Sequence, residues 1–262
     1  MLTAADLKPE KTVWLAISPE GSIARSLDER LPQVSSQTAP LFLIQANTRD
    51  TLYLVTETGE AAAIAVHALP ESEDLQSGLP LHKATALKGG QKLAGIFPLL
   101  PKERRNEAGA DGYVLSVTRQ GMLKKTALSE LPGPAAAMFT LVKVNDGDRL
   151  GWVQLTTGSD EIVLVSAEGM AIRFSEQDVR PMGLVAAGVM GMKLPENGEL
   201  IGAELASAKG ELFLLASDGS AKRVPYDQFS RQGRYGQGII AWKLAAKTRL
   251  VGSAGGQGAG RC

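Results

Sequence analysis

The sequence has one cysteine, Cys262, and only two histidines, His67 and His82, among its 262 residues. One cysteine forms no intramolecular disulfide, and two isolated histidines are too few to hold a metal ion. No run of about 18 apolar residues occurs, so nothing predicts a membrane-spanning helix. The first twenty residues also lack the apolar core of a signal peptide. These absences predict a soluble, cytoplasmic protein without a metal site.

Net charge is also lacking, because 28 Lys and Arg residues balance 28 Asp and Glu residues. The charges are unevenly spread: residues 1–100 carry 8 basic and 11 acidic side chains, and residues 205–262 carry 9 basic and 3 acidic ones. Zero net charge argues against nucleic-acid binding by the whole surface, whereas the basic C-terminal part is compatible with a local contact.

Five similar segments are what the sequence does contain. Each has an apolar run, a short turn ending in glycine, and a second run that often carries Lys or Arg. The glycine supplies the positive φ that tight hairpins need. A Ser or Thr three residues earlier can hydrogen-bond back into the turn. The turn glycines are Gly21, Gly59, Gly121, Gly169 and Gly219. They predict β-hairpins near residues 12–26, 51–66, 112–126, 161–174 and 211–224.

A second pattern of strand, polar turn and strand follows most of the hairpins, as in GVMGMKLPENGELIGAELAS from Gly188. One repeat of about 50 residues then holds about four strands, the size of a propeller blade. No long segment has a helical period. The sequence predicts an all-β, propeller-like disc of about five four-stranded blades over residues 7–254, with an incomplete sixth blade as a variant and a flexible tail at residues 255–262.

The fourth repeat resembles a signature segment in the C-terminal domain of the DNA gyrase A subunit and its topoisomerase IV counterpart. The resemblance rests on AIRFSEQDVRPMGLVAAGVMGMKL, on GMLKKTALSEL in the third repeat, and on GSAKRVPYDQF with QGRYGQG in the fifth. It extends over about Leu7 to Leu250 and implies a β-pinwheel, in which blades exchange strands with their neighbours.

In that family the pinwheel binds duplex DNA around its rim and bends or wraps it. The resemblance implies a non-catalytic, cofactor-free accessory domain that works beside a type IIA topoisomerase breakage-reunion domain. It also implies a monomeric isolated domain, sequence-tolerant DNA binding and a place at the nucleoid. Two features depart from the family. Its basic, glycine-rich box after the first blade corresponds here to QVSSQTA, Gln33 to Ala39, and only five hairpins are visible where gyrase commonly has six. The loss weakens the expectation of chiral wrapping, and a protein-interaction module is the alternative function.

Basic residues on the second strand of each hairpin are candidates for contacts with DNA phosphates. Solvated outer strands carry such residues too, so both explanations stay open. The second hairpin has alanines at these positions. The candidates are Arg25, Lys124, Lys125, Arg173, Lys222 and Arg223.

The stretch RQGRYGQG, from Arg231 to Gly238, adds a second kind of candidate. Arg231 and Arg234 could donate to phosphate oxygens, and Tyr235 could stack or contact a sugar. Arg180 is placed similarly in the family, where a structural role is equally open. The glycines also mimic a dinucleotide fingerprint, but the following IIAWKL is typical of a strand rather than a helix. No catalytic residue is predicted, since no carboxylates or histidines are evidently grouped.

Overall fold

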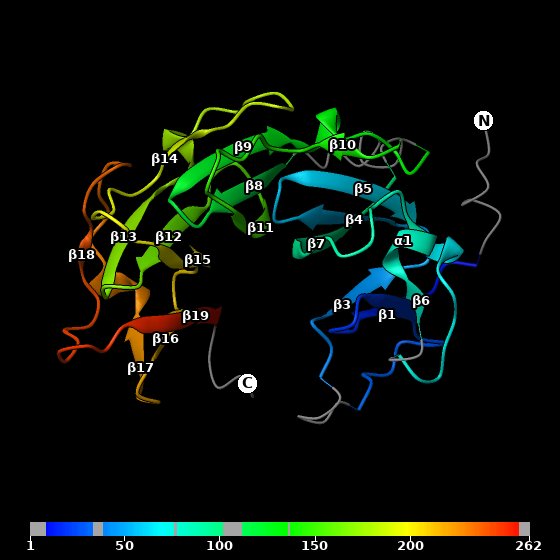
Figure 1. The fold of residues 1–262 in the computed structure, drawn as a ribbon, viewed down its shortest axis with the longest axis horizontal. Coiled ribbons are helices and arrows are strands. Elements are labelled where there is room, and N and C mark those ends of the chain that lie inside the picture. Colours follow the sequence, from blue (N-terminus) through cyan, green and yellow to red (C-terminus); the bar gives the residue numbers. More distant parts are fainter. Residues whose placement is uncertain (1–8, 34–38, 76–77, 102–111, 136, 257–262) are drawn as a thin grey trace. The chain divides into compact units, whose positions relative to one another are not determined.

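Five antiparallel hairpins form where the apolar runs and turn glycines predict them (Figure 1). The structure is a computed structural model, and it describes residues 9–33, 39–75, 78–101, 112–135 and 137–256. The φ angles of the five turn glycines lie between 82 and 85°, a region open to glycine. The hairpins are β1 (Thr12–Ile17) with β2 (Ser22–Arg25), β4 (Thr51–Thr56) with β5 (Glu60–Ala65), β8 (Tyr113–Thr118) with β9 (Met122–Ala127), β12 (Glu161–Ser166) with β13 (Met170–Ser175), and β16 (Glu211–Ala216) with β17 (Ala221–Pro225).

A strand of six or seven residues pairs with the first strand of every hairpin, again antiparallel. They add a third, partly buried strand to each sheet. The added strands are β3 (Phe42–Asn47), β7 (Leu93–Leu99), β11 (Leu150–Thr156), β15 (Leu200–Ala206) and β19 (Leu250–Gly256).

Four two-residue strands are exchanged between neighbouring sheets. Each follows one hairpin along the chain but pairs with the second strand of the preceding hairpin. These strands are β6 (Leu79–Pro80) on β2, β10 (Phe139–Thr140) on β5, β14 (Val189–Met190) on β9, and β18 (Ile239–Ile240) on β13. Gly78, Gly188 and Gly238 precede three of them, and a Cβ on any of these would lie 2.4 Å from a backbone oxygen of the receiving strand. Glycine is therefore required at these three positions, and the four exchanged strands confirm the predicted pinwheel arrangement.

The fifth sheet differs from the other four. The first four sheets have four strands each, and the fifth has three, in the order β17-β16-β19. No strand of the described part of the chain covers β17, and four of its five residues are exposed, Val224 being the buried one. Its open edge carries Lys222, Arg223 and Pro225, residue types that protect edge strands from pairing with other chains.

The chain divides into two compact units, Met1–Asp111 with Ser129–Leu141 and Gly112–Leu128 with Val142–Cys262. The first unit holds the first two sheets, and the second unit holds the other three. Each unit has its own buried apolar core.

The helical elements are short: η1 (Val66–Ala68), α1 (Leu81–Ala84), η2 (Leu128–Glu130), η3 (Glu176–Asp178) and η4 (Tyr226–Gln228). None of the described helices has the length and apolar character needed to cross a membrane.

Candidate nucleic-acid interface

Lys124 and Lys125 lie on β9 with their side chains inside the second unit. Lys124 is 0% exposed and Lys125 is 4% exposed. The Nζ of Lys125 donates to the backbone oxygen of Glu176 at 3.1 Å and lies 4.7 Å from the centre of the Tyr113 ring. DNA cannot reach these side chains while the fold is intact. Their burial corrects the expectation that they face solvent, and it removes both from the set of exposed DNA-binding candidates.

The carboxylate of Glu176 explains why an ammonium is tolerated there. It is fully buried, and it lies 3.7 Å from the Nζ of Lys125. The Oγ1 of Thr156 donates to it at 2.5 Å, and the backbone N–H groups of Gly158 and Asp160 donate at 2.9 and 3.1 Å. A buried charge pair needs such additional hydrogen bonds to offset the cost of desolvation. Lys125 therefore has a structural role.

Arg25 and Arg173 have the same kind of structural role. Each stands four residues after a turn glycine, as Lys125 does, and donates to a carbonyl in or directly after the 3-10 helix of the next hairpin. The three bonds join Arg25 Nε to Leu69 O at 3.0 Å, Lys125 Nζ to Glu176 O at 3.1 Å, and Arg173 Nη1 to Tyr226 O at 3.0 Å. Arg25 and Arg173 are also ion-paired, with Glu71 at 2.7 Å and Glu161 at 3.2 Å. Cations at this position therefore link neighbouring sheets.

Lys222 and Arg223, on the open edge of β17, are exposed. Arg223 stands four residues after its turn glycine, the position at which Arg25 and Arg173 link neighbouring sheets. Its side chain, however, is 62% exposed and forms an ion pair with Glu211 at 3.3 Å. The Nζ of Lys222 donates to the backbone oxygen of Ala241 at 3.1 Å. Both cations are open to a ligand, and both also protect the edge.

The loop before β18 divides its predicted residues between surface and interior. The side chain of Arg231 is 56% exposed and lies 3.6 Å from Glu161. Arg234 is partly buried, and its guanidinium donates to the backbone oxygen of Met190. Tyr235 is 51% exposed. Arg180, in the equivalent loop before β14, is exposed as well. Arg231, Tyr235 and Arg180 are thus presented to solvent, whereas Arg234 mainly supports the loop.

Four exposed lysines form a series that the sequence-based prediction missed. Each lies three residues after the last residue of an exchanged strand, and no carboxylate of the described chain pairs with any of them. Three are spaced 50 residues apart, in the fragments LVKVN, GMKLP and AWKLA, so their signal is present in the repeat. We call them the lysine series: Lys83, Lys143, Lys193 and Lys243.

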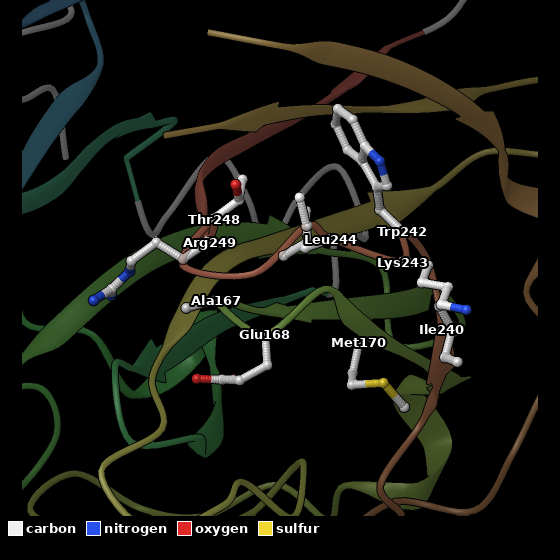
Figure 2. Close-up of a pocket in the computed structure, with 10 residues that line it drawn as sticks. Ala167, Glu168, Met170, Ile240, Trp242, Lys243, Leu244, Thr248 and Arg249 are labelled. Carbon is white, nitrogen blue, oxygen red and sulfur yellow. The ribbon is translucent and has the colours of Figure 1, made fainter. Parts of the chain in front are cut away.

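A shallow pocket of about 460 Å³ lies beside the last member of the series, within the second unit (Figure 2). Trp242 and Leu244 form part of an apolar lining, and Lys243, Thr248 and Arg249 add polar groups. A single carboxylate, Glu168, faces the pocket. No group of three or more His, Cys, Asp or Glu side chains suited to a metal ion occurs among the described residues. The lining therefore offers apolar contact and cations rather than paired acid–base groups.

Known proteins resemble the chain in both sequence and fold. Residues 112–150, 160–207 and 210–252 match the family described as the DNA gyrase C-terminal domain, beta-propeller. The DNA gyrase A subunit of Salmonella typhimurium is 38% identical over 159 residues, which is 61% of this chain and 17% of the relative. The corresponding gyrase subunit from Aminobacterium colombiense is 29% identical over 209 residues, 75% of this chain and 25% of the relative. The chain thus spans a quarter or less of these relatives.

Solved structures agree with these matches. The C-terminal domain of DNA topoisomerase IV superposes with a TM-score of 0.81 at 25% identity, covering 96% of this chain and 79% of that one. The Escherichia coli ParC C-terminal domain gives a TM-score of 0.73 at 13% identity, covering 95% and 100%. The second likeness bears on the fold alone. With its five hairpins, exchanged strands and matching repeats, the chain belongs to the family of DNA gyrase A C-terminal domains and has their β-pinwheel fold.

Proposed function

We propose that this chain binds duplex DNA without sequence preference and bends it, as a non-catalytic accessory domain of a type IIA topoisomerase. The observation that carries the proposal is the lysine series, one exposed lysine after each exchanged strand, without a carboxylate partner among the described residues. Lysine is a compact point charge that can neutralise a phosphate without reading a base. A cation repeated at the same place in successive blades is suited to follow a DNA backbone.

The other candidates divide by how free their charges are. Arg180, Lys222, Arg223 and Arg231 are exposed and join the proposed contact set, with Tyr235 as a sugar or base contact. Arg25, Arg173 and Arg234 are partly buried and donate to backbone oxygens, so their first role is structural. Bending a site of 20–30 base pairs costs on the order of 1–6 kcal/mol. Several phosphate contacts of this kind could offset that cost.

Duplex affinity measured with matched variants tests the proposal. Lys143→Gln, Lys193→Gln and Lys243→Gln, combined in one protein, should weaken binding of a linear duplex strongly at low salt. The control is Lys209→Gln, an exposed lysine outside the series, in the connection between β15 and β16, and it should bind like the wild type. If the wild type does not bind duplex DNA at all, the interaction-module alternative replaces this proposal.

Bending and wrapping are separated by ligating nicked circles in the presence of the protein. The gyrase-type box is absent near Gln33, and residues 34–38 of that loop lie outside the described chain. We therefore expect bent DNA with little change in linking number, and a large shift would show chiral wrapping instead. The proposal includes a topoisomerase breakage-reunion domain as partner, and a cytoplasmic, nucleoid-associated location.

A further inference from the structure

Two exposed residues in equivalent loops have positive backbone φ angles. Val185 precedes β14 and Tyr235 precedes β18, 50 residues further on, and their φ angles are 72° and 68°. Asn197 and Lys247 are the other described non-glycine residues with positive φ. Asparagine tolerates this region, but a β-branched valine strongly disfavours it. An unfavourable conformation that recurs at equivalent positions indicates that the surrounding structure imposes it.

The positive φ angles of Val185 and Tyr235 are imposed by backbone hydrogen bonds between their loops and the segments that carry the lysine series. The N–H of Lys143 donates to the carbonyl of Ala186 at 3.2 Å, and the N–H of Lys193 donates to that of Gly236 at 2.9 Å. The N–H of Tyr235 donates in addition to the carbonyl of Gly191 at 2.7 Å. Each loop is therefore hydrogen-bonded to the backbone of a lysine in the series, through the residue directly after Val185 or Tyr235.

The side chains of Val185 and Tyr235, which we call the apex side chains, are apolar or aromatic and open to solvent. Val185 is 59% exposed and Tyr235 is 51% exposed. Between Leu184 and Met190 the loop of Val185 has no charged residue, so it offers no side-chain cation to a phosphate. An apolar group beside a phosphate-binding lysine is suited to the sugar and base edges of a groove. Proteins that bend DNA use such apolar wedges in the minor groove.

We propose that Val185 and Tyr235 contact the deoxyribose and base edges of the minor groove and help to bend the duplex whose phosphates the adjacent lysines bind. The proposal rests on the DNA-binding function proposed above. It gives the blade whose loop lacks cations an apolar mode of contact, and it gives a function to an exposed valine with an unfavourable φ angle. Because no charge is involved, this contact contributes nothing to the salt dependence of binding.

Val185→Asn is the decisive variant, because asparagine accepts positive φ and is polar, uncharged and close to valine in size. In the 262-residue chain, Val185→Asn and Tyr235→Asn should each weaken duplex binding at least about fivefold, as expected when an apolar or stacking interaction with a nucleotide is removed. The bend angle, measured by energy transfer between dyes at the duplex ends, should fall. The slope of affinity against salt concentration should stay unchanged.

Val185→Tyr is the rescue variant, since it places in this loop the side chain found in the equivalent loop, and it should retain binding and bending. Asn197→Gly is the matched control at a positive φ outside these loops, and it should behave like the wild type. Wild-type binding and bending by both asparagine variants would overturn the apex contacts while leaving the DNA-binding proposal intact. If the wild type fails to bind duplex DNA, both proposals fall together.

Discussion

At Lys125 and Glu176 the protein keeps an ion pair where solvent does not reach. Replacing Lys125 with Met would remove the cationic partner of the buried Glu176 carboxylate. The free energy of unfolding should fall by about 3–5 kcal/mol, the usual cost of breaking a buried pair from one side. Urea unfolding measures the change, with Lys222→Met, at the exposed edge of β17, as the control. A Lys125→Met variant as stable as the control would contradict the structural role assigned to Lys125.

Glu204, on β15, should make stability depend on pH. Burial raises its pKa above the ordinary 4.5, although the Ser253 hydroxyl and the Gly255 N–H donate to the carboxylate. A raised folded-state pKa gives a contribution that is fully present below 4.5 and is lost as the pH rises through the raised value. Glu204→Gln cannot ionise, so its stability relative to the wild type should increase as the pH rises above 4.5. Urea unfolding over a pH series measures this, and a constant difference would contradict it.

At the scale of the strand, local chemistry decides what can be predicted. The hairpins follow from the apolar runs and turn glycines because both act within a few residues. The exchanged strands are two residues long and pair across blades, so only the family resemblance indicates them. Lys124 and Lys125 look like an exposed basic pair, because the fully buried Glu176 that pairs with Lys125 lies 51 residues away, in the 3-10 helix after another hairpin. The spacing of basic residues along one strand does not show which other segment of the chain covers that strand.

The open edge of β17 should resist self-association through Lys222, Arg223 and Pro225. Replacing Arg223 and Pro225 together with valine would remove one charge and restore a backbone N–H, leaving Lys222 as the one charged residue of a more apolar edge. We expect the double variant to form concentration-dependent oligomers in analytical ultracentrifugation. Lys209→Val, outside the strand, serves as the control for added surface hydrophobicity. A double variant that stays monomeric would show that the edge is protected in another way.

Across the whole molecule, repetition carries more functional information than any single motif. The lysine series is visible in the sequence after four of the five turn glycines, because Lys83, Lys193 and Lys243 each lie 24 residues after one and Lys143 lies 22 residues after one. These lysines lie after the exchanged strands, outside the hairpins that carry the more conspicuous basic residues. The glycine-rich loop at Arg231 is the more conspicuous motif, although one of its arginines supports the loop from within. Whether a charged side chain is free to bind DNA depends on its exposure and on its ion pairs, and both are known only from the fold.

The salt dependence of duplex binding tests most directly whether the lysine series holds phosphates. Affinity should fall steeply as salt rises for the wild type and for Lys209→Gln. For the variant carrying Lys143→Gln, Lys193→Gln and Lys243→Gln, the slope of log affinity against log salt concentration should be shallower by about 0.9 for each phosphate that the protein no longer neutralises. The same slope for this variant and the wild type would contradict the account.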